Sequence, residues 1–157
     1  MDGEPNPALR ALAAAGIAHT VTRHGPVGSL AEAAAARGVA PRDIVKTLVV
    51  RRADDDFLFV LVPGDREISW PKLRALLGVN RISMPDAGTA RAVTGYERGT
   101  ITPFGSTCPW PVVADATVPG RTISLGAGEH GLAATLDGSD VVRVLDAQVA
   151  DVTDEAG

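Results

Sequence analysis

Apolar and polar residues alternate with two different periods along this chain, and the pattern predicts short helices interspersed with short strands. The clearest pair of strands is residues 44–52 and 57–62, two apolar runs separated by a segment with three aspartates, which is typical of a β-hairpin. Helices are expected where a capping residue precedes a helical apolar repeat. These expected helices begin at or just after Asn6, Ser29, Ser69, Asp86 and Ser139.

The remaining apolar segments predict further strands, at residues 18–22, 81–84, 112–115, 122–125, 132–136 and 149–152. Residues 153–157 are expected to be frayed, because terminal residues are seldom tied down. Mixed helices and strands with a hairpin favour an α+β fold with a mixed sheet over a regular parallel βαβ repeat. No repeat or linker divides the chain, so residues 1–157 are expected to form one domain.

The composition is that of a globular protein, with 45% hydrophobic and 22% charged residues. No apolar run approaches the about 20 residues of a membrane span, and the acidic start of the chain does not resemble a signal peptide. A lone cysteine, Cys108, excludes an internal disulfide. These features predict a cytoplasmic protein with no membrane partner.

The net charge of −4 argues against sequence-independent coating of nucleic acid, and no DNA partner is expected. The charge is uneven, however, because residues 1–107 carry +2 and residues 108–157 carry −6. Residues 66–98 hold six basic and three acidic side chains. A local basic patch is one interpretation of this stretch; an ordinary solvated surface is the other, and charge alone favours it.

Several motifs point to chemistry that their surroundings do not support. Residues 126–131 match G-x-G-x-x-G, but almost no helix follows them, so a tight turn between strands is the better interpretation than a dinucleotide site. The histidines at 19, 24 and 130 have no metal-ligand spacing. Cys108 has no neighbouring base that would activate its thiol. No metal or cofactor is expected.

Lys46 is the anomalous residue of the hairpin. Alternation along a strand places it on one face with Ile44, Leu48 and Val50. Burying an ammonium group without a partner is costly. The lysine must therefore extend to an edge, pair with an acid, or face a cavity in which a ligand meets it, and the periodicity does not choose among these.

A second unusual stretch is the loop of residues 95–105, which is rich in glycine and lacks helix signals. Gly99 permits close approach of the backbone to a ligand, and Pro103 fixes the turn that follows. Such a loop can offer main-chain N–H groups to a carbonyl or an oxyanion. A loop of this composition is more often only a connection, so it is weak evidence by itself.

The order and spacing of these stretches resemble the YbaK-type aminoacyl-tRNA deacylases, a family that includes the inserted editing domain of bacterial prolyl-tRNA synthetases. The resemblance covers most of the chain. Its motifs are His24-x-Pro26, the lysine strand 45–50, residues 62–66 with Pro-Gly-Asp at their centre, the G-x-x-x-P loop of residues 99–103, and the glycine-rich turn before the last helix.

The resemblance implies a partly barrel-like mixed sheet, mostly antiparallel and surrounded by helices. It also implies hydrolysis of the ester of a mischarged tRNA that carries a small amino acid (Ala, Ser, Thr or Cys), with tRNA for proline favoured. The implied partners are the acceptor end of that tRNA and a prolyl-tRNA synthetase. Lys46 and Gly99 would be catalytic, without metal or cofactor. The implied substrate-binding residues are His24, Thr47, Thr100, Ile101, Thr102 and Pro103.

Three departures from the family pattern leave the amino acid specificity open. Thr22 stands where the cysteine-clearing branch tends to have an aromatic residue, the 100–104 segment is bulky, and Glu129 and His130 replace residues that are commonly basic. The alternative function is a catalytically silent module that binds aminoacyl-tRNA or a synthetase. An Nζ atom of Lys46 that points into an open cleft bordered by residues 99–103 favours the enzyme, whereas capping of Nζ by an internal carboxylate favours the module.

Overall fold

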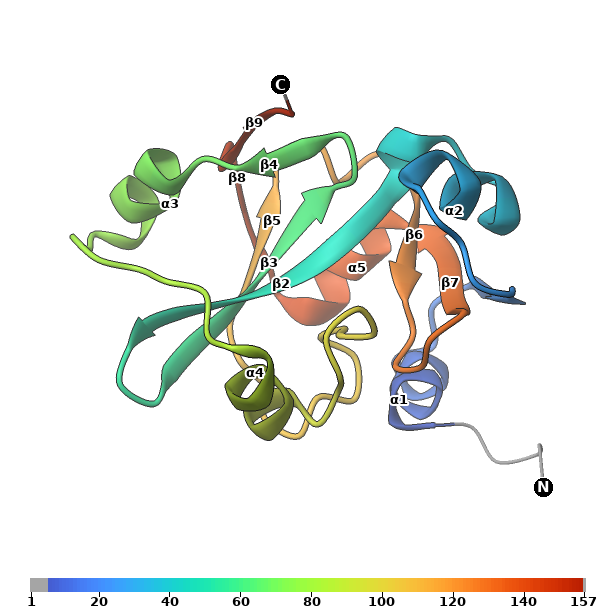
Figure 1. Ribbon diagram of the computed structural model, residues 1–157, viewed down its shortest axis with the longest axis horizontal. Coiled ribbons are helices and arrows are strands. Elements are labelled where there is room, and N and C mark those ends of the chain that lie inside the picture. Colours follow the sequence, from blue (N-terminus) through green and yellow to red (C-terminus); the bar gives the residue numbers. More distant parts are fainter. Residues whose placement is uncertain (1–5, 157) are drawn as a thin grey trace.

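The computed structural model describes residues 6–156, in which helices and strands alternate as the sequence pattern predicts (Figure 1). The helices are α1 (Pro7–Ala15), α2 (Leu30–Arg37), the 3₁₀ turn η1 (Pro41–Asp43), α3 (Trp70–Leu77), α4 (Ala87–Thr94) and α5 (Gly138–Leu145). The strands are β1 (His19–Arg23), β2 (Ile44–Ala53), β3 (Asp56–Pro63), β4 (Arg66–Ile68), β5 (Val112–Asp115), β6 (Thr122–Gly126), β7 (Leu132–Asp137), β8 (Gln148–Ala150) and β9 (Thr153–Glu155).

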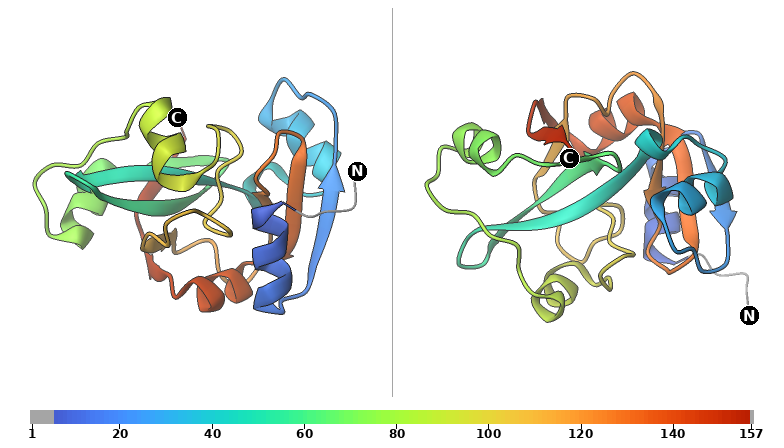
Figure 2. Two further views of the ribbon diagram at one scale, coloured as in Figure 1. Left: turned by 90° about the horizontal axis from the view of Figure 1, so that it is seen from below. Right: turned by 45° about the horizontal axis from the view of Figure 1, so that its top comes forward.

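Seven strands form one sheet in the order β1-β7-β6-β2-β3-β5-β8, and β4 pairs with β9 in a small second sheet. The longest ladders are antiparallel and include the β2–β3 hairpin, in which Lys46 lies opposite Val62. Shorter parallel ladders join β2 to β6, β3 to β5 and β5 to β8. Figure 2 shows β6 and β7 running steeply across the direction of β2 and β3, so the sheet curls as a partly barrel-like fold requires.

The β2–β3 hairpin is the centre of the molecule because both of its faces are buried. Every residue of β3 after Asp56 is buried, as expected for a central strand covered on two sides. One face packs Val49, Phe59 and Leu61 against residues of α1, α5 and β6. The other face packs Val60 against α3, whose Leu73 is fully buried. The hairpin is therefore a fixed support on which a site can be built.

Helix capping follows the sequence prediction at four of the five helices. The side chains of Asn6, Ser29, Ser69 and Asp86 accept hydrogen bonds from backbone N–H groups of the first turn. The prediction was wrong for α5. Asp137 caps that helix, and the Oγ of Ser139 instead accepts a 2.8 Å hydrogen bond from the Gly120 N–H.

Two predictions about these segments were also wrong, and the bounds of a third differ. Residues 81–84 do not form a strand but a single bridge, in which Ser83 pairs with Arg51. The last expected strand lies slightly earlier, at β8. Residues 153–155, expected to fray, form β9 against β4, since Lys72 on α3 binds Asp151 and Asp154 and Arg66 binds Thr153. Local sequence gave no sign of these long-range partners.

One other expectation about a segment was met. Residues 126–131 form the tight connection between β6 and β7, with no helix after it, as the pattern predicted. None of the helices in residues 6–156 combines the length and hydrophobicity that crossing a bilayer requires.

Candidate active site

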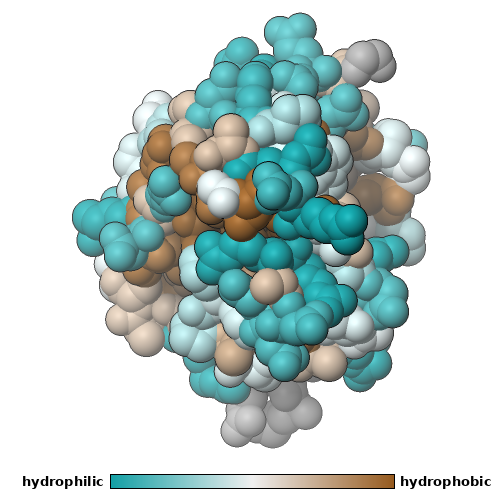
Figure 3. Space-filling model, turned by 90° about the vertical axis from the view of Figure 1, so that its left-hand side faces the viewer, coloured by the Kyte–Doolittle hydropathy of each residue, from teal (hydrophilic) through white to brown (hydrophobic). Residues whose placement is uncertain are grey.

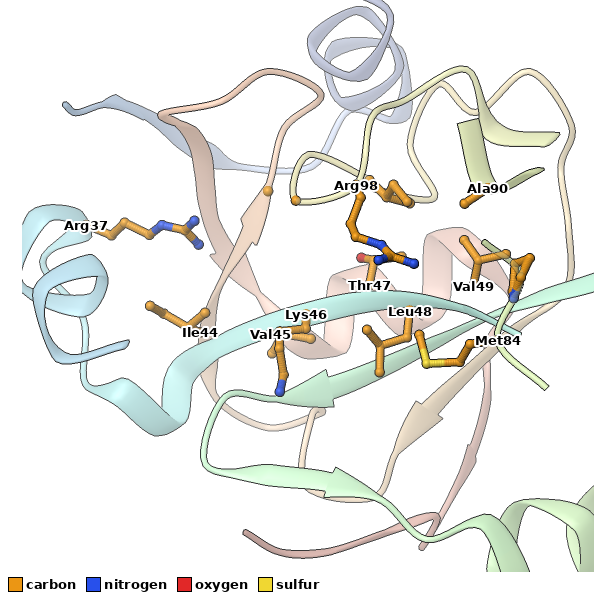
Figure 4. Close-up of a pocket in the computed structure, with 14 residues that line it drawn as sticks. Arg37, Ile44, Val45, Lys46, Thr47, Leu48, Val49, Met84, Ala90 and Arg98 are labelled. Carbon is orange, nitrogen blue, oxygen red and sulfur yellow. The ribbon is translucent and has the colours of Figure 1, made fainter. Parts of the chain in front are cut away.

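A cavity of about 340 Å³ lies along β2 (Figure 4). This is within the size range of small-molecule binding sites. Its walls come from five parts of the chain: α2, β2, the segment around Met84 with α4, the loop that contains Gly99 and Ile101, and the end of β6 at Gly126. Lys46 and Gly99, the two residues predicted to be catalytic, thus line one cavity although they lie in different halves of the sequence.

The cavity exists because the sheet splits. Strand β6 pairs with β2 only at Ile44 and Val45 and then departs from it. The next neighbour on that edge is Ser83, whose N–H and C=O bond to those of Arg51 at 3.1 and 2.7 Å. Between these two contacts the edge of β2 faces the cavity.

The backbone of this open edge is polar. Ile44 accepts a hydrogen bond from Gly64 on the β3 side, whereas Arg51 bonds to Ser83 on the open side. Backbone groups alternate in direction along a strand, so Thr47 and Val49, which are in phase with Arg51, direct their N–H and C=O groups towards the cavity. The site therefore offers main-chain donors and acceptors as well as side chains.

Three cations contribute to the walls of the cavity, namely Arg37, Lys46 and Arg98. Among the described residues, no aspartate or glutamate lines it. Burial lowers the pKa of the Arg37 guanidinium, whose Nε is buried without a hydrogen-bond partner. Arg98 is partly balanced by Asp86, whose pKa is lowered by hydrogen bonds from Thr89 and, to a lesser degree, by the charge of Arg98. A group of cations with no acid in the cavity wall suits an anionic ligand.

The side chain of Lys46 is exposed and takes part in no ion pair within residues 6–156. No carboxylate of the described residues caps it. Figure 4 shows it on the same side of β2 as Leu48, while Thr47 and Val49 point towards Arg98 on the other side. Lys46 therefore reaches the cavity from its rim, on a flexible four-carbon stem, and does not point at the Gly99 loop.

Thr47 differs from its neighbours because its hydroxyl is buried. The Oγ1 atom is inaccessible to solvent and has no hydrogen-bond partner in the described structure. An unsatisfied buried hydroxyl costs free energy, and such atoms call for an explanation in function or in bound solvent. Thr47 lines the cavity, so this hydroxyl can contact a ligand there once its side chain turns out of the buried rotamer.

The opposite part of the cavity is apolar, with Val49, Met84, Pro85 and Ala90 on its wall. Met84 is 46% exposed although it is a large hydrophobic residue. Ala90 lies on α4 with 4% exposure, and its small side chain leaves room in the cavity. The site thus combines a cationic part with an apolar part.

The loop of residues 95–105 is held rigidly. Thr100 donates from both its N–H and its hydroxyl to the carbonyl of Glu97, and its own carbonyl accepts from Gly128. The hydroxyl of Tyr96 donates to the Phe104 carbonyl at 2.7 Å, and burial raises the pKa of Tyr96 to about 12. The loop is therefore positioned before any ligand arrives.

The loop residues predicted to bind substrate separate into two groups. Gly99 and Ile101 line the cavity, whereas Thr100, Thr102 and Pro103 are buried beneath the loop and do not. Thr102 accepts a hydrogen bond from the Phe104 N–H, which is an internal role. Gly99 has a φ of 91°, a conformation that favours glycine.

His24 lies in an adjoining cavity of about 470 Å³ that shares Arg37 and Gly99 with the first. Its Nδ1 contacts the Gly25 carbonyl at 2.8 Å, and its Nε2 is buried without a partner. His130 lies in the same cavity, and its Nε2 is 3.2 Å from Glu97 Oε2. The structure therefore brings His24 next to the Gly99 loop but away from Lys46.

Sequence reasoning missed several residues of the site. Arg37 gave no signal, because a basic residue in the last turn of a helix is common. Arg98 directly precedes Gly99, and this adjacency was the available clue. His130 was not singled out in the sequence, and its exposed ring lies near Gly99. Within the described residues, no group of three or more His, Cys, Asp or Glu side chains is arranged to hold a metal ion.

The domain is thus a curled mixed sheet with an anchored glycine loop and a cavity that has three cations in its wall. The sequence profile of the aminoacyl-tRNA editing domain matches residues 24–144, so this chain belongs to the aminoacyl-tRNA editing domain family. Its editing domain is related to that of prolyl-tRNA synthetases, which accords with the resemblance noted from the motifs.

Among curated proteins, a proline–tRNA ligase of Heliobacterium modesticaldum is 40% identical over 94 residues, which are 59% of this chain and 16% of the ligase. A proline–tRNA ligase of Desulfovibrio desulfuricans is 38% identical over 94 residues, again 16% of its length. The chain therefore matches only a small part of these curated relatives.

Solved structures share the fold over nearly the whole chain. The hypothetical protein APE2540 superposes with a TM-score of 0.86 at 26% identity, covering 95% of this chain and all of the other. A protein described as a proposed trans-editing enzyme for prolyl-tRNA synthetase superposes with a TM-score of 0.82 at 22% identity, covering 98% of this chain and all of the other. The α+β fold with a mostly antiparallel sheet is thereby confirmed.

Proposed function

We propose that this protein, as a single domain acting in the cytoplasm, hydrolyses the ester that joins a wrong amino acid to the 3′-terminal adenosine of a tRNA. The observation that carries the proposal is the meeting of Lys46 and Gly99 at one cavity that is cationic on one part and apolar on another. Family membership supplies the substrate class, aminoacyl-tRNA. The cavity volume suits a terminal nucleoside or a small aminoacyl group.

In this proposal Lys46 binds the anionic, nucleotide end of the substrate at the rim of the cavity. Backbone N–H groups of Gly99 and Ile101, together with the hydroxyl of Thr47, contact the aminoacyl ester. Water attacks the carbonyl carbon, the bond between this carbon and the ribose oxygen breaks, and that oxygen takes up a proton. An ester is reactive enough for positioning and stabilisation of the oxyanion to accelerate this step.

The remaining assignments follow from the relatives. The matched regions of proline–tRNA ligases make tRNA for proline the first carrier to test and a prolyl-tRNA synthetase the first partner to test. An apolar wall formed by Val49, Met84 and Ala90 suits small amino acids, so alanine, serine, threonine and cysteine are the candidates. His24 would act from the adjoining cavity, on the nucleotide side of the ester.

A second candidate function is a silent module that binds aminoacyl-tRNA or a synthetase without hydrolysis. The observation that favours it is the direction of Lys46, whose side chain lies on the Leu48 side of β2 and not towards the Gly99 loop (Figure 4). The module would bind tRNA equally well with and without Lys46.

The deciding experiment incubates the protein with tRNA for proline that carries alanine, serine, threonine or cysteine, and follows loss of the aminoacyl group. We expect at least one ester to be cleared, and Lys46→Ala to lower kcat/KM by about a hundredfold or more. Lys72→Ala, which removes the other lysine of the chain, is the matched control and keeps the activity. If no ester is cleared faster than by Lys46→Ala, the enzyme assignment is wrong; tRNA binding that survives this substitution then identifies the module.

A further inference from the structure

A second groove, of about 540 Å³, continues from the cavity along β2 and is lined by four arginines. Arg51 and Arg52 come from β2, Arg74 comes from α3, and Arg81 comes from the segment that links α3 to α4. Among the described residues the groove has one acidic side chain in its lining, that of Asp54. This clustering is notable in a chain whose net charge is −4.

Two of the four arginines are already neutralised. Arg51 pairs with Asp54, and Arg52 binds both carboxylate oxygens of Asp56 at 3.0 and 3.1 Å. Arg74 and Arg81 take part in none of the ion pairs within residues 6–156. The groove therefore carries a surplus of two guanidinium groups.

The basic stretch noted in the sequence does not form one patch. Arg66 and Lys72 bind residues of the C-terminal segment, and Arg91 lies 3.9 Å from Glu97. Folding instead selects Arg74 and Arg81 and places them beside two arginines of the hairpin. Figure 3 shows this side of the molecule, with hydrophilic side chains gathered across its middle and apolar ones beside them.

The groove and the cavity are adjacent along two segments. On β2, Arg51 lies two residues beyond Val49, which lines the cavity. On the facing segment, Ser83 lines the groove and Met84 lines the cavity. The Arg51–Ser83 bridge fixes these segments to each other, so both sites belong to one rigid edge.

The spacing suits a polymer with repeated phosphates. The backbone of Arg51 is five strand positions from that of Lys46, about 17 Å, and the odd spacing directs the two side chains to opposite faces of β2. A ligand whose 3′ end lies at Lys46 must extend out of the cavity, and the groove is the cationic route beside it. Guanidinium groups bind phosphate oxygens in a bidentate manner, which makes arginine well suited to a nucleic acid backbone.

We infer that this groove binds the sugar–phosphate backbone of the tRNA on the 5′ side of its aminoacylated terminal nucleotide. Arg74 and Arg81 are the principal contacts, each made to a phosphate. The inference rests on the proposed function, because the substrate at Lys46 sets the direction of the chain. The arginines hold the acceptor end while the terminal ester occupies the cavity.

The test compares two substrates, a mischarged full-length tRNA and the aminoacylated CCA trinucleotide, in wild type, in the Arg74→Ala/Arg81→Ala double variant and in Arg81→Glu. Arg143→Ala is the matched control, because Arg143 is an exposed arginine on α5 that pairs with one acid and lines neither site. Circular dichroism melting establishes that each variant is folded.

We expect the double variant to lower kcat/KM on full-length tRNA by about tenfold while changing turnover of the trinucleotide by less than about twofold. The slope of log affinity against log salt concentration falls by about one for each phosphate that the variant no longer binds. Arg81→Glu, a single exposed substitution, acts in the same direction. Arg143→Ala leaves kcat/KM unchanged on both substrates.

Equal effects on the two substrates, or an unchanged salt dependence of tRNA binding, would overturn the inference. So would competition for the groove by an acidic peptide that leaves tRNA binding intact. Binding of uncharged tRNA, measured by fluorescence anisotropy, separates this result from failure of the proposed function. If the wild type clears no ester and the double variant loses binding of uncharged tRNA, the deacylase is refuted and the groove is retained. If the wild type clears an ester and the double variant binds uncharged tRNA as the wild type does, only the groove is refuted.

Discussion

Arg51 and Ser83 exchange two backbone hydrogen bonds, of 2.7 and 3.1 Å, across an edge of β2 that β6 has already left. This bridge ties the segment between α3 and α4 to the central hairpin. On one side of the bridge lies the cavity beside Lys46, and on the other lies the arginine groove. One backbone contact therefore separates and aligns the two sites of the proposed function.

Gly99→Ala tests the loop that lines the cavity together with Lys46. At a φ of 91° an added Cβ costs about 1–2 kcal/mol of backbone strain. The Cβ itself would meet the His130 ring at an ordinary 3.6 Å, so the conformation and not crowding is the obstacle. We expect a fall of about tenfold or more in deacylation in a steady-state assay.

The control for Gly99→Ala is Gly120→Ala. Gly120 has a φ of 84° and nothing within 4 Å of an added Cβ, and it lies outside the cavity. It should lower the melting temperature by a similar amount and leave deacylation unchanged. Similar losses of activity in both variants would show that the loop acts only through stability.

Thr47→Val tests the buried hydroxyl on the cavity wall. Because Oγ1 has no partner among the described residues, replacing it with a methyl group of the same shape should leave the free energy of unfolding unchanged or raise it. If the hydroxyl contacts the substrate, kcat/KM falls by about tenfold at the same time. Thr47→Ser retains the hydroxyl and should retain most of the activity. The assignment is contradicted if denaturation shows that Thr47→Val lowers the free energy of unfolding while the kinetic assay shows unchanged kcat/KM.

Ala90→Val tests the apolar part of the cavity. The substitution adds two methyl groups to a wall that Ala90 shares with Val49 and Met84. Clearance of threonine should fall about tenfold more than clearance of alanine, because the larger side chain loses its space. Ala92→Val, on the exposed side of the same helix, is the control. Equal effects on both amino acids would place the aminoacyl group elsewhere.

Asp115 predicts a dependence of stability on pH. Burial by itself raises its pKa, but hydrogen bonds from Thr117, Val152 and Thr153 outweigh burial and hold the pKa below its ordinary value. A carboxyl whose folded pKa is depressed contributes stability above the unfolded pKa of 3.8, and this stability is lost as the pH falls through the folded pKa.

The variant that isolates this effect is Asp115→Asn. We expect it to lower the free energy of unfolding by about 1.5–3 kcal/mol at pH 7 and to flatten the acid limb below pH 3.8. Urea denaturation between pH 2 and 7 measures both. If the free energy of unfolding falls equally in wild type and Asp115→Asn as the pH is lowered, other carboxyls cause the pH dependence.

Local sequence was sufficient for elements whose signals are local. Asn6, Ser29 and Ser69 cap helices as predicted, because a cap needs a side-chain oxygen and only the N–H groups of the next turn. The hairpin was predictable because its turn lies within one short run of aspartates. Asp137 displaced Ser139 as a cap because Ser139 is bound to Gly120, a distant residue that the pattern does not reveal.

The candidate site was predictable only in part, for the same reason. Lys46 and Gly99 stand out locally, one as a charge on an apolar strand and the other as a glycine in a rigid loop. Arg37 and Arg98 do not stand out. Thr102 and Ile101 were both predicted to bind substrate, but folding buries Thr102 and exposes Ile101 to the cavity. Which loop residues reach a site depends on the hydrogen bonds that anchor the loop.

By itself the sequence determined the type and order of most elements, the central hairpin and the motifs that mark the family, because each depends on neighbouring residues and their periodicity. The tertiary structure decided where β6 leaves β2, that β9 returns to pair with β4, and that Lys46 lies at the rim of a cavity shared with Gly99. These features depend on packing between segments far apart in the chain, whose free energies no local pattern contains.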